Sequence, residues 1–114
     1  MIDARIVQRL AMATPGVVDE SNDLSLRFSA GGKAFAWTWM ERTAPRKLRR
    51  ARMDVLAVRC ALATKGMLLA AAPDRFFDEP HYHRYPAILA RLDVIDEAEL
   101  AALLDEACRL VSAG

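Results

Sequence analysis

The stretch Phe35–Cys60, FAWTWMERTAPRKLRRARMDVLAVRC, predicts two apolar strands joined by a charged connection. In its first part, Phe35, Trp37 and Trp39 alternate with small or polar residues, and side chains two apart lie on the same face of a strand. A second apolar run at residues 54–59 follows the connection. We expect the two runs to pair as a hairpin, with the three aromatic rings on one face and the connection at the tip.

The connection concentrates the positive charge of the chain. It holds six of the sixteen Lys and Arg residues, whereas the rest of the chain has ten basic and fifteen acidic side chains, a net charge of −5. Clustered basic residues bind phosphates by releasing condensed counterions, and the ordinary alternative is a solvated loop that its like charges keep extended. The six residues are Arg42, Arg46, Lys47, Arg49, Arg50 and Arg52.

Upstream of this stretch, the sequence predicts one helix and one further strand. Residues 3–13 place apolar side chains at helical spacing, and the Pro-Gly pair at 15–16 ends that pattern. Residues 24–29 alternate apolar and polar side chains from Leu24 onward, which is typical of a half-buried strand. The two glycines at 31–32 supply the positive φ angles of a tight hairpin turn.

Downstream, strands alternate with helices. Leu56 and Val58 are expected to face the core, and Asp96 followed by Glu99 is close to a capping box for the last helix. This order, with its short hairpins, predicts an α+β sandwich in which an antiparallel sheet is packed by the N- and C-terminal helices. The predicted elements are a strand at 54–59, a helix at 61–72, an ordered non-repetitive crossing at 73–86, a strand at 87–92 and a helix after 96.

Length and composition favour one soluble domain over residues 1–114. A chain of this size fits a single core, and its 54% hydrophobic content is ample for one. No apolar run approaches the roughly 20 residues that cross a bilayer, so no membrane partner is expected. The charged start of the chain is unlike a signal peptide, and Cys60 and Cys108 have neither zinc nor disulfide spacing. We expect reduced cysteines and a cytoplasmic protein.

Several segments resemble the MmcQ/YjbR family. They occur in the order and spacing of that family and together span nearly the whole chain. The segments are PGV at 15–17, GKAFAW at 32–37, APDRFF at 72–77, HY at 81–82, YPAILARL at 85–92 and DEAEL at 96–100.

The resemblance implies a CyaY-like fold, an α+β sandwich that matches the order of elements given above. It also implies DNA binding through projecting β-hairpins that act as wings. The chain departs from the family in one respect, because its connection after the second strand is longer and richer in arginine. That departure favours a wing in this protein, although it is equally compatible with a local elaboration.

A second group of candidate residues is aromatic and contains histidine. A small-ligand pocket at Trp37, Trp39, His81 and Tyr82 is one interpretation, and packing of the rings with a backbone contact from His81 is the other. His81 and His83 would set both rings on one face if they lay on a strand, yet no third metal ligand is evident beyond Asp78 and Glu79. No metal site and no cofactor are predicted.

The sequence thus favours a binding domain over an enzyme. It contains no nucleophile elbow, phosphate-binding loop or dinucleotide-binding motif. The leading hypothesis is a non-enzymatic domain that contacts the phosphates of double-stranded DNA through the basic hairpin. The alternative is a module that binds a protein or a small ligand through the aromatic and histidine segment at residues 76–86.

Overall fold

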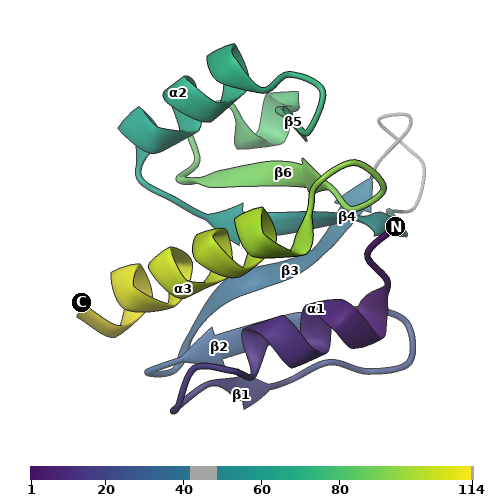
Figure 1. Ribbon diagram of the computed structural model, residues 1–114, viewed down its shortest axis with the longest axis vertical. Helices are drawn as coiled ribbons and strands as arrows, with labels where there is room; N and C mark the ends of the chain where they lie inside the picture. Colours follow the sequence, from purple (N-terminus) through teal and green to yellow (C-terminus); the bar gives the residue numbers. More distant parts are fainter. Residues whose placement is uncertain (42–48, 114) are drawn as a thin grey trace.

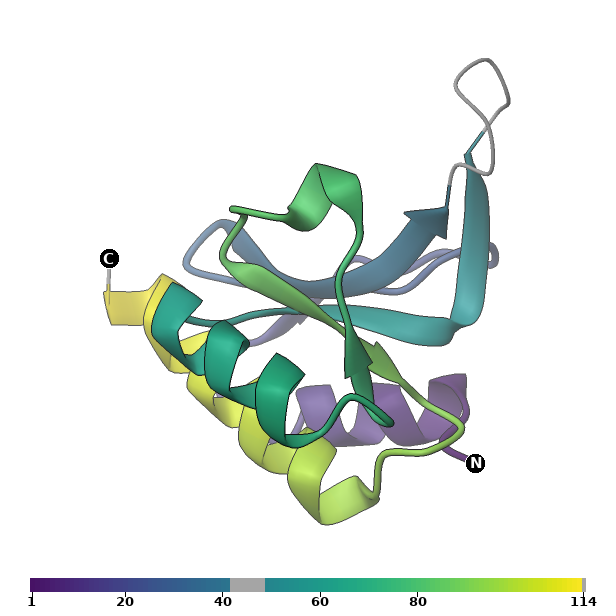
Figure 2. The same ribbon diagram turned by 90° about the horizontal axis from the view of Figure 1, so that it is seen from above.

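The computed structural model describes residues 1–41 and 49–113 of the chain. Six strands form one sheet in the order β1-β2-β3-β4-β6-β5, with every neighbouring pair antiparallel. The helices α1 and α3 lie across one face of this sheet (Figures 1 and 2). The predicted α+β sandwich is therefore confirmed. Its elements are α1 (Ala4–Ala11), β1 (Val18–Asp19), β2 (Arg27–Ala30), β3 (Lys33–Glu41), β4 (Arg50–Arg59), α2 (Leu62–Ala71), β5 (Phe76–Phe77), the 3-10 helix η1 (Pro80–Tyr82), β6 (Ala87–Arg91) and α3 (Glu97–Ala113).

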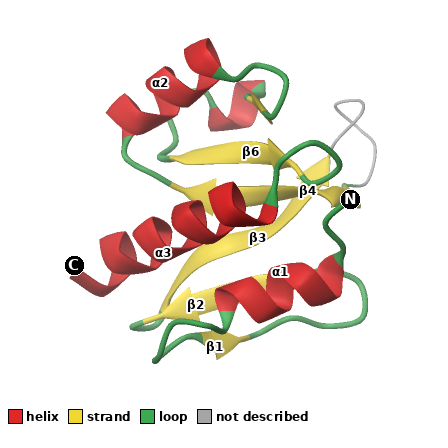
Figure 3. Ribbon diagram, in the orientation of Figure 1, coloured by secondary structure: helices red, strands yellow, loops and turns green. Residues whose placement is uncertain are grey.

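The first and last helices, α1 and α3, lie near the two ends of the chain (Figure 3). Each begins after a short polar side chain that caps it. The Asp3 carboxylate accepts a hydrogen bond from the Ile6 N–H at 3.0 Å. The Asp96 carboxylate accepts one from the Glu99 N–H at 2.7 Å, which confirms the predicted cap of α3. These acceptors satisfy N–H groups that have no partner within the first turn of a helix.

A tight turn connects β2 to β3, as predicted. Gly31 and Gly32 have φ angles of 60° and 79°, and Ala30 pairs with Lys33 on either side of them. Two consecutive residues with positive φ match the twist of the flanking strands, and glycine adopts this conformation without the clash of a Cβ atom. The turn fixes where β3 begins.

The expectation that Phe35 shares a face with Trp37 and Trp39 is wrong. Phe28 pairs with Ala36 and Ser29 pairs with Ala34, so Phe35 has no partner residue on β2 and forms a β-bulge. One extra residue in a strand breaks the period-2 alternation. Phe35 consequently packs in the core beneath the helices, whereas the two tryptophans belong to the opposite face.

The predicted strand at 24–29 begins three residues late. Leu24 is 78% exposed and lies before β2, in a turn organised by Asn22. The Asn22 side chain accepts hydrogen bonds from the N–H groups of Leu24 and Ser25, at 2.8 and 2.9 Å. Asparagine side chains favour turns in this way, because they offer the backbone an acceptor outside the sheet.

The face of the sheet that carries α1 and α3, here called the inner face, holds the main hydrophobic core. Leu56 and Val58 are fully buried there, as predicted, and both free cysteines lie in the same cluster. Large apolar residues without solvent contact supply most of the stabilisation of such a core. The largest are Phe28, Phe35, Phe76, Leu56, Ile88, Leu89, Leu92, Leu100, Val7 and Val58, of which Leu89 belongs to the opposite face.

The opposite face, here called the outer face, is covered in part by the crossing between α2 and β6. The crossing was predicted to be non-repetitive, but it contains β5, which pairs with β6, and the short helix η1. Figure 2 shows η1 on the side of the sheet away from α1 and α3. Across residues 1–41 and 49–113, no helix combines the length and apolarity needed to span a membrane.

Candidate nucleic-acid interface

The predicted wing corresponds to the end of the β3–β4 hairpin. Trp39–Glu41 pair with Arg50–Arg52, while only Val55–Arg59 of β4 also pair with β6. The end of the hairpin is therefore a two-stranded extension that leaves the plane of the main sheet (Figure 2). A register shift in β4 between Arg52 and Leu56 marks the bend. Such irregularities turn a strand and increase its local twist.

The described part of the hairpin carries three of the six predicted basic residues. Arg49 and Arg50 are exposed, and Arg52 is partly buried. The other three, Arg42, Arg46 and Lys47, lie outside the described residues.

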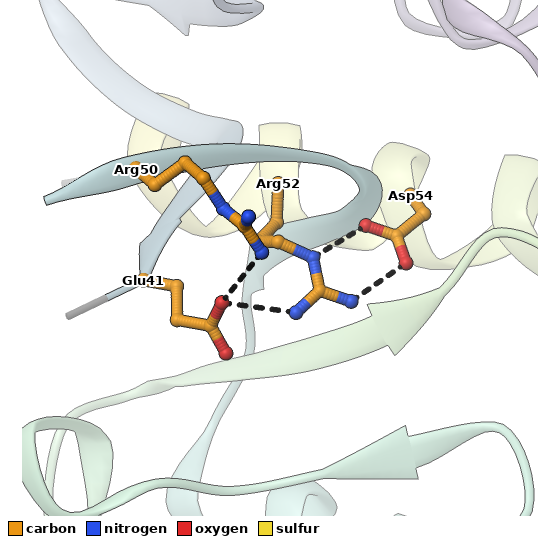
Figure 4. Close-up of polar contacts among 4 residues, drawn as sticks. All are labelled: Glu41, Arg50, Arg52 and Asp54. Carbon is orange, nitrogen blue, oxygen red and sulfur yellow. Dashed lines mark hydrogen bonds and ion pairs between the residues drawn. The ribbon is translucent and has the colours of Figure 1, made fainter. Parts of the chain in front are cut away.

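Carboxylates of the hairpin hold Arg52 on two sides (Figure 4). Its Nε and Nη2 atoms donate to the two oxygens of Asp54 at 2.9 and 2.8 Å, and its Nη1 donates to Glu41 Oε1 at 3.0 Å. The bidentate hydrogen bond to Asp54 raises the pKa of Arg52 above its ordinary value, and the hydrogen bond to Glu41 adds to this effect. The same hydrogen bond lowers the pKa of Asp54. Arg52 thus stabilises the hairpin geometry.

Arg50 is engaged much less tightly than Arg52. Its Nη2 atom lies 3.4 Å from the same Glu41 oxygen, and 71% of its side chain is exposed. An exposed pair at that distance contributes little energy and is screened by salt. Arg49 is exposed as well. Among the described residues at the end of the hairpin, 39–41 and 49–52, Arg49 and Arg50 are therefore the cations that an incoming anion can reach.

Aromatic side chains on the outer face form a connected cluster beside the hairpin. The Trp37 indole N–H donates to the Tyr82 hydroxyl at 3.1 Å, and Tyr85 meets both rings edge to face. Burial raises the pKa of the Tyr82 hydroxyl, because the charged form loses solvent there. Edge-to-face contacts of this kind stabilise aromatic pairs beyond the area that they bury.

A buried lysine of α2 holds the crossing in place. The Lys65 Nζ atom donates to the backbone oxygens of Tyr82 and Tyr85 and lies 3.1 Å from Asp78 Oδ1. Only 3% of Lys65 is exposed. Two hydrogen bonds to backbone oxygens and the nearby Asp78 carboxylate stabilise this buried ammonium group. Lys65 therefore positions the two tyrosines over the sheet.

Three of the four residues predicted for a ligand pocket meet at one hollow of about 270 Å³. Trp37, His81 and Tyr82 line it together with Tyr85 and Arg49. The fourth, Trp39, does not line the hollow. It is buried in the outer-face cluster against which Trp37 and Tyr82 pack, and it meets Phe77 edge to face at 5.3 Å. Arg49 links this hollow to the end of the hairpin.

The histidines lie on η1 and directly after it rather than on a strand. Both are exposed, and the Nδ1 atom of His83 is 3.9 Å from an Asp78 oxygen. Among the residues that the structure describes, no three His, Cys, Asp or Glu side chains gather as a metal site would require. Cys60 is buried, and burial raises the pKa of its thiol to about 11. At neutral pH that sulfur is protonated, which makes it a weak nucleophile.

Comparison with protein families agrees with this architecture. A sequence model of the YjbR family matches residues 12–110. The chain belongs to the YjbR family. The match covers most of the chain and confirms the resemblance found in its segments, and the antiparallel α+β sheet is compatible with a YjbR-like fold. A search of curated proteins finds no match to the chain.

Sequence reasoning missed several basic residues that this YjbR chain places on the outer face. Arg59 lies against the rings of Trp37 and Tyr85, with its guanidinium carbon 5.7 and 5.4 Å from their centroids. The alternation along β4 gives a signal for Arg59, because it follows the core residue Val58 and must point to the opposite face. The contact between Arg59 and Tyr85 has no such signal in the sequence, since the two residues are far apart along the chain.

Proposed function

We propose that this YjbR-family chain is a non-enzymatic nucleic-acid-binding domain whose β3–β4 hairpin contacts the phosphates of double-stranded DNA. The observation that carries the proposal is the two-stranded extension with Arg49 and Arg50 exposed at its end. Lys and Arg side chains that neutralise phosphates release condensed counterions, and this release drives binding irrespective of base sequence.

The charge distribution along the chain supports the same surface. The six basic residues of segment 42–52 stand against a net charge of −5 on the rest of the chain. A polyanion is repelled by the acidic remainder and attracted by the basic segment, so the field of the protein orients the encounter. Arg42, Arg46 and Lys47 enter the proposal through their charge and their place in the sequence alone.

Arg52 has a supporting role in this proposal. Its guanidinium is hydrogen-bonded to Glu41 and Asp54, so carboxylates within the hairpin largely neutralise its charge. By neutralising Glu41, it removes a carboxylate that would repel a phosphate near Arg50. Phosphate contacts are therefore assigned mainly to Arg49 and Arg50 and to the basic residues between the two strands.

Paired variants with equal loss of charge test the proposal. Arg49→Ala/Arg50→Ala removes two cations from the hairpin, and Arg5→Ala/Arg9→Ala removes two exposed cations from α1 on the inner face. Affinity for a random duplex is measured at low salt by fluorescence anisotropy. We expect about a tenfold or larger loss for the hairpin variant and less than about a twofold change for the helix variant. Equal losses in both variants would reject the hairpin as the binding surface.

A further inference from the structure

A second hollow on the outer face has the features of a ligand site. It has a volume of about 370 Å³ and lies between the Gly31-Gly32 turn and Tyr85. That volume is within the range of small-molecule sites. Its walls combine three cations with two aromatic rings, Arg27, Lys33, Arg59, Trp37 and Tyr85. We call the hollow lined by these five residues the outer-face cleft.

Arg59 is fixed in the cleft by neutral partners. Its Nε atom donates to the Ala34 carbonyl at 2.8 Å, and its Nη2 atom donates to the Tyr85 hydroxyl at 3.0 Å. The rings of Trp37 and Tyr85 flank it. These contacts orient the guanidinium but leave its charge uncompensated, in contrast to Arg52. A preorganised cation of this kind binds an anion at little further cost in side-chain entropy.

The other cations of the cleft also keep most of their charge. No acidic residue lines the cleft, and within residues 1–41 and 49–113 neither Lys33 nor Arg59 has a carboxylate partner at salt-bridge distance. Arg27 lies 3.7 Å from Glu20, with about half of each side chain exposed. Such a pair is weak and opens readily. The cleft is therefore positively charged.

We propose that the outer-face cleft binds a nucleotide, with the phosphate held by Lys33, Arg59 and Arg27 and the planar base against Trp37 or Tyr85. Guanidinium and ammonium groups form charge-assisted hydrogen bonds with phosphate oxygens. Aromatic side chains provide stacking surfaces that accept any base. A ligand with both a phosphate and a planar ring contacts the cations and the aromatic rings of the cleft, whereas a simple anion contacts only the cations.

The cleft includes residues of β3 and β4 but does not include Arg49 or Arg50 at the exposed end of the β3–β4 hairpin. Trp37 and Tyr85 line both the cleft and the smaller hollow that Arg49 borders, so the two rings stand between them. The nucleotide can be a free mononucleotide or one unit of a single strand. This inference does not rest on duplex binding by the hairpin, because the two surfaces use different cations.

The first test is an NMR titration of the isotope-labelled full chain with adenosine 5′-monophosphate. We expect saturable shifts of the Trp37 indole N–H and the Arg59 Nε–H signals. Adenosine alone and inorganic phosphate alone should each bind about tenfold more weakly, because each lacks one of the two contacts. A short oligothymidylate is titrated in the same way to represent a single strand. Whichever of the two ligands binds with the higher affinity per phosphate shows whether the cleft takes a free mononucleotide or one unit of a single strand. Absence of saturable shifts with both ligands would overturn the proposal.

Variants separate the cleft from the hairpin in the same titration. Lys33→Ala and Arg59→Gln should each weaken the affinity for the mononucleotide by about tenfold, the loss typical of a charge-assisted hydrogen bond. Arg49→Ala/Arg50→Ala should leave that affinity within about twofold. Because Arg59 also holds the Ala34 carbonyl, the exposed double variant Arg27→Ala/Lys33→Ala provides a test that does not disturb packing. Unchanged affinity in this double variant would contradict the assignment of the phosphate site.

Discussion

The two faces of the sheet are built from alternate residues of the same strands, yet they have opposite chemistry. On the inner face, Phe28, Leu56 and Ile88 are fully buried beneath α1 and α3. On the outer face, Trp37 and Arg59 lie at adjoining positions and remain partly open to solvent. The inner face holds the larger of the two hydrophobic clusters and therefore contributes most to stability, because burial of apolar area is the dominant favourable term in folding. The outer face retains accessible cations and rings, and our proposals assign phosphate and base contacts to these groups.

The largest effect should come from breaking the inner face. Phe28→Ala removes a fully buried ring and should lower the free energy of unfolding by about 3 to 5 kcal/mol. The matched variant is Phe77→Ala, which removes a half-buried ring from the outer face and should cost about 1 to 2 kcal/mol. Urea unfolding of both variants gives the difference. Equal losses would contradict the division of roles between the faces.

An intermediate effect is expected at Lys65, which connects the two sides of the molecule through α2. Lys65→Met leaves the Asp78 carboxylate and two backbone oxygens without their partner and should cost about 2 to 4 kcal/mol. It should also release Tyr82 and Tyr85, which would broaden or shift the indole N–H signal of Trp37. The control Lys33→Met, at an exposed site, should change stability by less than about 0.5 kcal/mol. A Lys65 variant as stable as this control would refute the role given to Lys65.

The smallest effect is expected at the hairpin. The folded pKa of Asp54 is lowered, so the Arg52–Asp54 pair contributes stability above the unfolded pKa and loses it as the pH falls through the folded value. Because both side chains are partly exposed, Arg52→Gln should cost less than about 1 kcal/mol at neutral pH. Below the folded pKa of Asp54, the free energies of unfolding of the variant and the natural chain should differ less. Denaturant unfolding at neutral pH and at a pH below that pKa checks this. A larger difference in stability at the acidic pH than at neutral pH would contradict this direction of the pH dependence.

Much of the fold could be predicted because its signals are local. The glycines of the β2–β3 turn, the Asp96 cap and the apolar alternation around Leu56 each depend on residues close in sequence. The bulge at Phe35 could not be predicted, since a single unpaired residue follows from how two strands meet. The alternation alone therefore assigned Phe35 to the wrong face.

The candidate sites were predictable only in part, for the same reason. Composition located the basic segment and the aromatic segment, and Arg49 of the former lines the same outer-face hollow as His81 and Tyr82 of the latter. Composition gave no indication that Arg52 is held by Glu41 and Asp54, because these contacts depend on the register of the hairpin. It also gave no indication that Arg59 meets Tyr85, which requires the crossing to fold over β4.

The dependence of duplex affinity on salt tests the central claim most directly. If the hairpin and its basic connection neutralise about four or five phosphates, a plot of log affinity against log salt concentration should have a slope of about −4, from roughly −0.9 per contact. The Arg49→Ala/Arg50→Ala variant should reduce that slope by about 2. No measurable affinity at low salt, or an affinity that does not change with salt, would contradict the account.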